Sequence, residues 1–255
     1  MNIFRNYPIT SYEFGTSSQV EGVNLIQDLS AYSDVLDQVK DQVTALSFYT
    51  VLEGDRPDQL SQKFYGRSDF HWTFWLINDH IRESGWPLDR TELDQFLAAK
   101  YSGVAVVTRT DFFGTIPDGS NVAGPTLRVG DTLVGSVSAT SATVTKLDPD
   151  NGQIFLTGTS LYTATEAATW VDSNGVTQTL IVHASTTYAN SIDHAEDADG
   201  QIVDYDPTVG PGVLNVTVSL KDMVIRRNEE LRQIRLIKPN YIEQIVDTFN
   251  RSLQD

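Results

Sequence analysis

Apolar and polar residues between positions 46 and 103 alternate in a way that predicts one strand followed by three helices. The run Ser47–Leu52 is rich in aromatic and β-branched residues and ends at a Gly-Asp turn, so it predicts the strand. A helix is predicted over Pro57–Gly66, because proline is tolerated in a first turn and glycine caps a C-terminus. Apolar residues at helical spacing predict a second helix over Asp69–Ile81 and a third over Asp89–Ala99.

In residues 104–215 the sequence pattern changes from that of helices to that of short strands. Runs of Thr, Ser and Val are separated by turns that contain Gly, Asn or Asp. The strand candidates are Val104–Val107, Thr132–Ser136, Thr143–Leu147, Gln153–Thr157, Thr169–Val171 and Gln178–Val182. Regularly spaced short strands with Asn-Gly turns predict a small all-β barrel or sandwich. We therefore interpret this segment as a β-domain inserted into the chain.

The N-terminal segment 1–45 has too few apolar residues to fold alone, and we expect an extended arm that becomes ordered on the next segment or on a partner. Val23–Ile26 predicts a short strand within it. A helical stripe follows, made of Val35, Leu36, Val39 and Val43.

Residues 216–255 return to a mixed pattern. They predict a strand over Val216–Leu220, a second strand that ends at Ile237, and a final helix that begins at Lys238-Pro239-Asn240. The apolar stripe of that helix consists of Ile242, Ile245, Val246, Phe249 and Leu253. The fold class expected for the whole chain is α+β, with this last strand and helix packing on the 46–103 domain or on a partner.

The charge of the chain narrows the range of partners. Its 255 residues include 18 Lys and Arg against 34 Asp and Glu, a net charge of -16, and residues 104–215 are its most acidic part. Nucleic acids and anionic membranes are therefore not expected as partners, because both are negatively charged. The sequence has no apolar run of transmembrane length and no signal-peptide pattern, so we expect a protein made in a cytoplasm.

Residues that could carry catalysis are sparse. The sequence has no Cys, no Gly-x-Ser-x-Gly elbow, no P-loop and no dinucleotide fingerprint. His71 and His80 fall on one predicted helix, but their spacing does not suit a shared metal. His183 is expected in a strand and His194 in an acidic loop. We predict that the chain is not an enzyme and holds no cofactor.

The acidic run from Asp193 to Asp206 resembles a calcium loop only in part. A loop that starts at Ala195 has acidic residues at its third and fifth positions and Gly200 at its sixth. Its first position lacks a carboxylate, and its twelfth is Asp206 where a bidentate Glu is usual. We therefore interpret the run as a solvated acidic turn and predict no metal site.

Aromatic residues gather in one part of the sequence. The cluster consists of Tyr65, Phe70, Trp72, Phe74, Trp75 and Trp86. Such residues can stack on sugars, but they also dominate cores and protein contacts, and we favour the second interpretation. Arg56 could pair with a buried carboxylate or remain a surface charge, and the sequence leaves both open.

Spaced residues in this region resemble a known motif. The pattern consists of Tyr49, Val51, Gly54, Asp55, Arg56, Pro57, Leu60, Tyr65, Gly66, Trp72, Trp75, Asn78 and Trp86-Pro87-Leu88. Its first half resembles a lysin motif, and the whole run resembles the small lysin-motif-containing baseplate wedge subunit of contractile-tailed phages of the T-even kind. A second segment is similar to the end of the same family; it includes Asn228, Glu229, Arg232, Ile234, Leu236, Ile237 and Pro239.

The resemblance implies a small β-α-α-β domain and a structural role. Subunits of this family clamp neighbouring wedges around the tail hub, in six copies or a multiple of six. The implied partners are other wedge subunits, a sheath-initiator-like subunit and the hub periphery. The implied location is the tail baseplate of the virion, assembled in the host cytoplasm. The resemblance does not extend to residues 104–215.

Two other functions stay open at this point. Gly54-Asp55 and Asn78 also suit a lysin motif that binds peptidoglycan, although the motif is single and no hydrolase motif accompanies it. A phage-tail hydrolase is the less favoured alternative, since the sequence offers no convincing active site.

Overall fold

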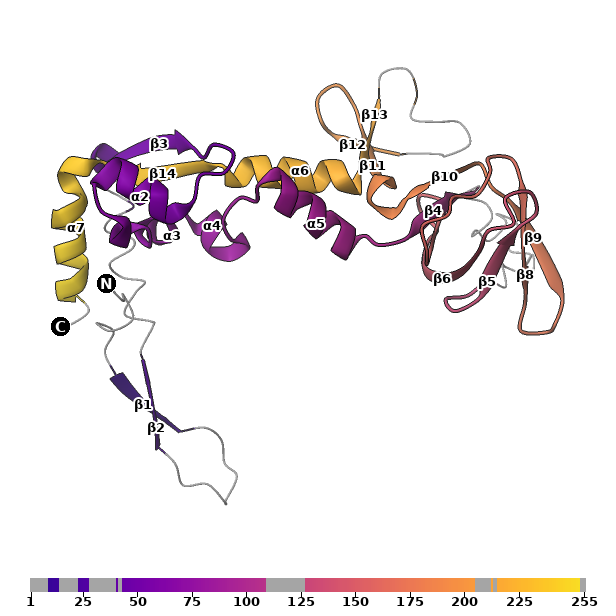
Figure 1. The fold of residues 1–255 in the computed structure, drawn as a ribbon, viewed down its shortest axis with the longest axis horizontal. Coiled ribbons are helices and arrows are strands. Elements are labelled where there is room, and N and C mark those ends of the chain that lie inside the picture. The colour runs from indigo at the N-terminus through magenta and orange to yellow at the C-terminus, as the bar shows by residue number, and fades with distance from the viewer. Residues whose placement is uncertain are drawn as a thin grey trace. The chain divides into compact units, whose positions relative to one another are not determined.

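The computed structural model describes residues 9–13, 23–27, 40, 43–108, 127–204, 212 and 215–252 (Figure 1). The chain has a mixed α+β fold, which confirms the predicted class. It divides into two compact units. The first unit combines residues 1–89 with residues 228–255, and the second is residues 90–227.

The first unit is built on two antiparallel strands that lie far apart in the sequence. β3 (Leu46–Thr50) pairs with β14 (Gln233–Ile237), so that Tyr49 lies opposite Ile234. The helical elements of the unit are η2 (Val43–Ala45), α2 (Pro57–Tyr65), η3 (Ser68–Phe70), α3 (Thr73–Ile77), α4 (Asp79–Ser84) and α7 (Pro239–Ser252). Helices α2 and α3 lie beside the two strands (Figure 1).

Local sequence signals set the boundaries of the first helix as predicted. Pro57 occupies the first turn of α2, and Gly66 follows it in the left-handed conformation, with φ of 69°. The predicted single helix over Asp69–Ile81 is wrong. That segment forms η3, α3 and α4, and the backbone is extended at Asn78, where φ is -121° and ψ is 96°. The apolar period continues across this break, which is why the sequence pattern did not reveal it.

Side chains of helix α3 contribute to both hydrophobic cores of the first unit. Phe74 packs with Val51, Leu60 and Ile234 in one cluster. Leu76 and Ile77 pack in a second cluster, which the apolar stripe of α7 completes as predicted, with Ile242, Ile245, Val246 and Phe249 all buried. Leu253 of that stripe lies outside the described residues. The C-terminal helix is therefore part of the core of this unit.

A helix that the sequence pattern did not predict follows β13 (Val216–Ser219). This helix, α6, spans Leu220–Leu231. Ser219 Oγ accepts the amide of Asp222 at 3.1 Å, and Asp222 Oδ2 accepts the Ser219 hydroxyl at 2.7 Å and the Ser219 amide at 3.1 Å. This reciprocal cap is the signal for a helix start that could have been recognised in the sequence.

The second unit contains an antiparallel sheet of seven strands in the order β10-β4-β7-β6-β5-β8-β9. The strands are β4 (Val104–Val107), β5 (Thr132–Gly135), β6 (Ser141–Asp148), β7 (Gln153–Leu156), β8 (Ala167–Val171), β9 (Thr177–Ile181) and β10 (Ala184–Thr187). Helix α5 (Arg90–Lys100) precedes them, close to its predicted bounds. The six predicted strands of this segment are confirmed within about two residues, and β10 was missed.

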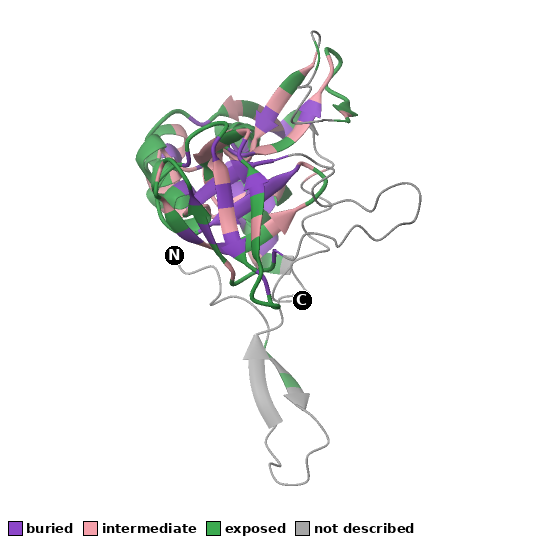
Figure 2. Ribbon diagram, turned by 90° about the vertical axis from the view of Figure 1, so that its right-hand side faces the viewer, coloured by how far each residue is buried: buried purple, intermediate pink, exposed green. Residues whose placement is uncertain are grey.

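The sheet curves around one core without closing. Strands from both halves of the sheet bury side chains in the same cluster, for example Val106 and Ile154 with Leu133 and Trp170. A register shift in β6 after Val144 fits this curvature, because bulges increase local twist. Within residues 104–108 and 127–204 the ladder is open at both ends, so the closed barrel that we expected as one alternative is not formed. Figure 2 shows buried and exposed positions mixed along these strands.

A buried carboxylate fastens two turns of this sheet. Glu166 is 3% exposed, and its oxygens accept the amides of Val137, Ser138 and Thr163 and the hydroxyl of Ser138, all between 2.6 and 2.9 Å. Desolvation alone would raise the pKa of Glu166, but these hydrogen bonds outweigh it and hold the pKa below its usual value. Gly135 leaves room for this cage, since a Cβ there would lie 2.3 Å from Ser138 Oγ.

A smaller sheet completes the second unit. β11 (Ile192–Glu196) pairs with β12 (Ile202–Val203) and with β13. The predicted strand Val216–Leu220 is thus confirmed, although Leu220 already belongs to α6. The run Asp193–Asp206 was expected to be a solvated acidic turn, but its described part contains β11, β12 and the hairpin turn between them, and Asp206 lies outside the described residues.

In the N-terminal segment, β1 (Ile9–Glu13) pairs antiparallel with β2 (Val23–Gln27). The strand expected over Val23–Ile26 is confirmed. Most of the predicted helical stripe, Val35 to Val39, lies outside the described residues. No helix among the described residues is both long and apolar enough to cross a membrane.

Candidate functional site

We call the residues that carry the family resemblance in the two segments the signature residues. Those that follow β3 form a closed turn. Asp55 Oδ2 accepts the hydroxyl of Tyr49 at 2.8 Å and the amide of Leu52 at 3.1 Å. Gly54 takes the left-handed conformation that this turn requires, with φ of 79°. The carboxylate of Asp55 therefore holds the turn between β3 and α2.

The signature residues of α2 divide between core and surface. Leu60 is buried, and burial raises the pKa of the Tyr65 hydroxyl above its ordinary value. Arg56 is exposed, and its Nε lies 3.3 Å from a carboxylate oxygen of Asp58. Of the two interpretations left open for Arg56, the surface charge is therefore the one found.

The tryptophans of the aromatic cluster do not form one surface. Trp72 packs on Phe249 of α7, with ring centroids 5.2 Å apart. Trp75 and Trp86 pack together at 5.5 Å on the other core of the unit, and Trp86 Nε1 donates to the carbonyl of Asp55 at 2.9 Å. These rings pack within the unit, which is the core part of the favoured interpretation, while its protein-contact part stays a prediction.

The side chain of Asn78 makes hydrogen bonds to the edge of β14 that the backbone of a neighbouring strand would otherwise make. Its Nδ2 donates to the carbonyl of Arg235 at 2.9 Å and to the carbonyl of Phe74 at 2.8 Å, while its Oδ1 accepts the amide of Arg235 at 2.8 Å. The residue is 2% exposed. Its amide therefore uses its hydrogen-bonding groups inside the protein, which also explains the helix break at this position.

The second signature segment is fastened to the first. Asn228 accepts the amide of Leu88 at 2.8 Å and donates to its carbonyl at 3.0 Å. Arg232 forms ion pairs with Glu53 at 2.7 Å and with Glu229 at 3.3 Å. Every signature residue thus lies in the first unit, and those with polar side chains mostly bind other parts of that unit.

An exposed face of β3 is left beside this framework. Phe48 is 84% exposed and lies opposite Arg235 in the ladder, and Leu52 is 58% exposed just past the strand. We call Phe48, Leu52 and Arg235 the outer β3 face. Phe48 was not singled out in the sequence, because an alternating strand pattern does not say which of its two faces a neighbouring element covers.

The histidines lie in different places from those expected. His71 follows η3 and His80 lies in α4, so they do not share one helix, and His183 lies in a bend between β9 and β10. His194 is in β11, not in a loop. Within the described part of the chain, no group of three or more His, Asp or Glu residues is arranged to hold a metal ion.

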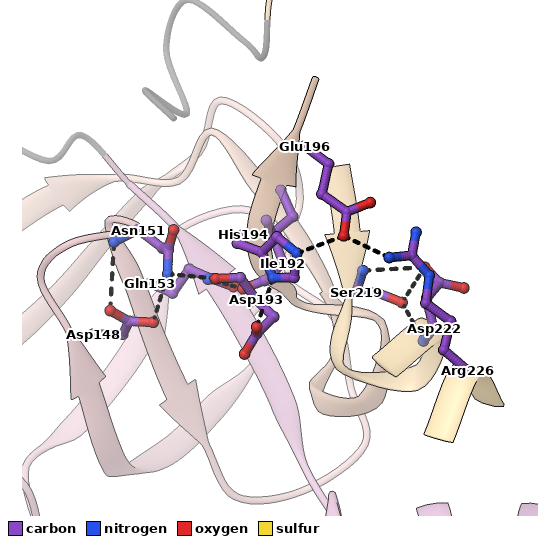
Figure 3. A network of polar contacts seen from close by, with 10 residues as sticks. All are labelled: Asp148, Asn151, Gln153, Ile192, Asp193, His194, Glu196, Ser219, Asp222 and Arg226. Atoms are coloured by element: carbon purple, nitrogen blue, oxygen red, sulfur yellow. Dashed lines mark hydrogen bonds and ion pairs between the residues drawn. The ribbon is translucent and has the colours of Figure 1, made fainter. Parts of the chain in front are cut away.

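A cluster of charged residues joins β11 to α6 (Figure 3). His194 Nδ1 lies 2.8 Å from Asp193 Oδ2, and its Nε2 lies 3.0 Å from Glu196 Oε1. Arg226 of α6 binds the same oxygen of Glu196 at 2.5 Å. Hydrogen bonds to Asp193 and then Glu196 raise the pKa of His194, while Arg226 and then His194 lower the pKa of Glu196 to about 2.

The residues around this cluster are hydrogen-bonded to its neighbouring elements on both sides. The nearby hydroxyl of Ser219 is engaged with Asp222 at the start of α6. On the other side, Asn151 and Gln153 donate to the carbonyls of Asp193 and Ile192 (Figure 3). These contacts connect β11 to α6 on one side and to residues 151–153 on the other.

Comparisons with known proteins add no relative. A scan against protein-family models finds no match to this chain, and a search of curated proteins finds none either.

Proposed function

We propose that this chain is a structural subunit of the baseplate wedge of a contractile phage tail, where it clamps neighbouring wedge subunits together around the hub. It acts there without catalysis or cofactor, in the virion baseplate that assembles in the host cytoplasm. Its partners are other wedge subunits, a sheath-initiator-like subunit and the hub periphery, in six copies or a multiple of six.

The observation that carries this proposal is the pairing of β3 with β14. The two segments that resemble the family lie on either side of residues 104–215 in the sequence, and the ladder places them side by side. Arg232 reaches Glu53, and Asn78 reaches Arg235, so residues of both segments are bound to each other. Such joining is expected if both segments come from one ancestral module.

The order β3, α2, α3, β14 also supports a lysin-motif-like β-α-α-β domain. In this proposal the second strand of the motif comes from the C-terminal part of the chain, and residues 104–215 are an insertion between the helices and that strand. The N-terminal arm then reaches a partner. The outer β3 face offers the domain a contact surface, because large exposed apolar side chains are typical of protein interfaces.

The environment of the signature residues weighs against the peptidoglycan-binding alternative. Asn78 is buried with its amide engaged, and Asp55 accepts bonds from its own turn. A glycan would have to displace these contacts to use either side chain. The alternative therefore serves as the competing outcome of the test.

The test is co-expression of the chain with the proteins encoded beside it in its genome, followed by affinity capture and a parallel peptidoglycan pelleting assay. We expect a stable complex and no pelleting. Phe48→Asp should reduce the captured complex by at least about tenfold, because it places a charge in an apolar contact. Gln59→Asp is the control, since it adds the same charge at an exposed position of α2. Pelleting with cell wall and no protein complex would overturn the proposal.

A further inference from the structure

Among the described residues, β9 pairs with no strand on its outer side, and the strands at this edge of the seven-stranded sheet carry less charge than the rest of the chain. The segments 132–145 and 167–182, which contain β5, the beginning of β6, β8 and β9, include one charged residue, Asp172, although charged residues make up 20% of the chain. Asp172 is buried and accepts the amides of Asn174 and Val176 at 2.9 Å. No charge is therefore presented by the strands at this edge.

Apolar and threonine side chains cover the outward face of the same strands. Val171 is 61% exposed, and Val134 and Ile181 are also exposed. In the ladder, Val171 lies beside Thr177, and Thr169 lies beside Thr179. Edge strands of soluble monomers are normally protected by lysine, proline or a bulge, and β9 has none of these.

Within the part of the chain that the structure describes, the backbone of β9 has hydrogen-bonding groups without a partner at regular spacing. Asp172 donates to Val176 and Val182 donates to Glu166, so the alternation of the ladder directs Gln178 and Leu180 toward β8. Thr177, Thr179 and Ile181 face away from β8, and Ile181 accepts the hydroxyl of Thr108. Among the described residues, none binds the backbone N–H or C=O of Thr177 or Thr179.

We propose that β9 is a self-association edge, on which a second copy of this chain adds its own β9 in antiparallel orientation. With a two-fold axis at Gln178, Thr177 of one copy faces Thr179 of the other. Each such pair exchanges both backbone hydrogen bonds, and the free groups of both threonines are used in each copy. The sheets of two copies then form one continuous sheet.

The charge distribution is the reason for choosing a second copy as the partner. The chain carries a net charge of -16, so most ways of bringing two copies together place acidic surfaces against each other. An uncharged strand lets two acidic copies approach without that repulsion. Antiparallel pairing also places the exposed threonines opposite each other, and such pairs stabilise adjacent strands. The inference goes beyond the proposed function and does not rest on it.

The test is sedimentation equilibrium of the full chain at increasing protein concentration. We expect a reversible dimer of the 28.3 kDa chain. Thr179→Pro removes an outward N–H and blocks the edge, while the bonds of β8 to Gln178 and Leu180 remain. It should weaken dimerisation by at least about tenfold. Thr179→Val, which keeps the backbone groups and the β-branched shape of the side chain, should still dimerise.

Two further variants keep the test decisive. Thr177→Lys combined with Thr179→Lys should also give a monomer, and circular dichroism shows whether either edge variant is folded. Ser141→Lys adds a charge on β6, beside Val134 and away from the edge, and should leave the dimer intact. A wild-type monomer at all concentrations would overturn the proposal. So would a dimer that survives both folded edge variants, or one that Ser141→Lys abolishes.

Discussion

Two asparagine side chains hold the first unit together by imitating backbone. Asn78 offers β14 an acceptor and a donor, as a neighbouring strand would, and Asn228 does the same for the backbone of Leu88. An amide is the only uncharged side chain that can donate and accept in this parallel fashion. Neither role can be exchanged for Asp or Leu without leaving backbone groups unpaired.

Replacing Asn78 by Ala should lower the free energy of unfolding of the full chain by about 2–4 kcal/mol. The change leaves the N–H and C=O of Arg235 without partners near the core, and each unpaired buried group costs about 1–3 kcal/mol. Urea denaturation measures the loss. Asn240→Ala, at an exposed position of α7, is the control and should change stability little. Equal stability of the two variants would contradict the role given to Asn78.

At the scale of elements, charged pairs fasten strands to helices. His194 faces a carboxylate oxygen at each ring nitrogen, and both contacts are hydrogen bonds only when the imidazole is protonated. Arg226 adds a link from Glu196 to α6. The junction of β11 with α6 is thus strongest with His194 in its charged form.

The stability of this junction should decrease as pH rises. The pKa of His194 is raised above its ordinary value of 6.5 in the folded state, so its stabilising effect is fully present below pH 6.5 and disappears as pH rises through the higher folded pKa. The difference in unfolding free energy between the wild type and His194→Gln should therefore shrink above pH 6.5. Denaturation at a series of pH values measures it.

An independent readout is the titration of His194 followed by NMR. Glu196→Gln removes one of the two carboxylates and should lower the pKa of His194 toward 6.5. An unchanged His194 pKa in that variant would show that the contact with Glu196 does not persist in solution.

At the scale of the molecule, hydrogen bonds within the second unit explain part of its high content of acidic residues. Several of its carboxylates accept amides of their own turns, as Asp131, Asp172 and Asp197 do, and Glu166 is buried in its cage. Turns of a small all-antiparallel sheet need such acceptors. The negative charge of this segment is therefore not by itself evidence for a positively charged partner.

The two compact units should fold separately. Each has its own buried cluster, and the cut ends of the first unit lie close together, because the amide of Leu88 is 2.8 Å from Asn228 Oδ1. We expect a chain in which a short Gly-Ser linker replaces 90–227 to unfold cooperatively, and 90–227 alone to do the same. Calorimetry of both fragments tests this. Failure of the isolated 90–227 fragment to fold would mean that it needs the first unit.

The sequence determined the local elements well where one residue sets a boundary. Pro57 and Gly66 bound α2, the described residues of the α7 stripe are buried, and the Thr- and Val-rich runs are strands, because propensity and periodicity act over a few neighbouring residues. The same signals failed at Asn78 and at α6. There a side-chain hydrogen bond decides the outcome, and a period in apolar residues does not report it.

Only the tertiary structure decided which elements meet. The pairing of β3 with β14 spans more than 180 residues, and no local pattern encodes a register between strands so far apart. The open ladder of the seven-stranded sheet was equally invisible, since the same short strands would build a closed barrel. This long-range pairing also determines which face of each strand is covered. It therefore decides which signature residues are buried, and it leaves the strand face that carries Phe48 exposed.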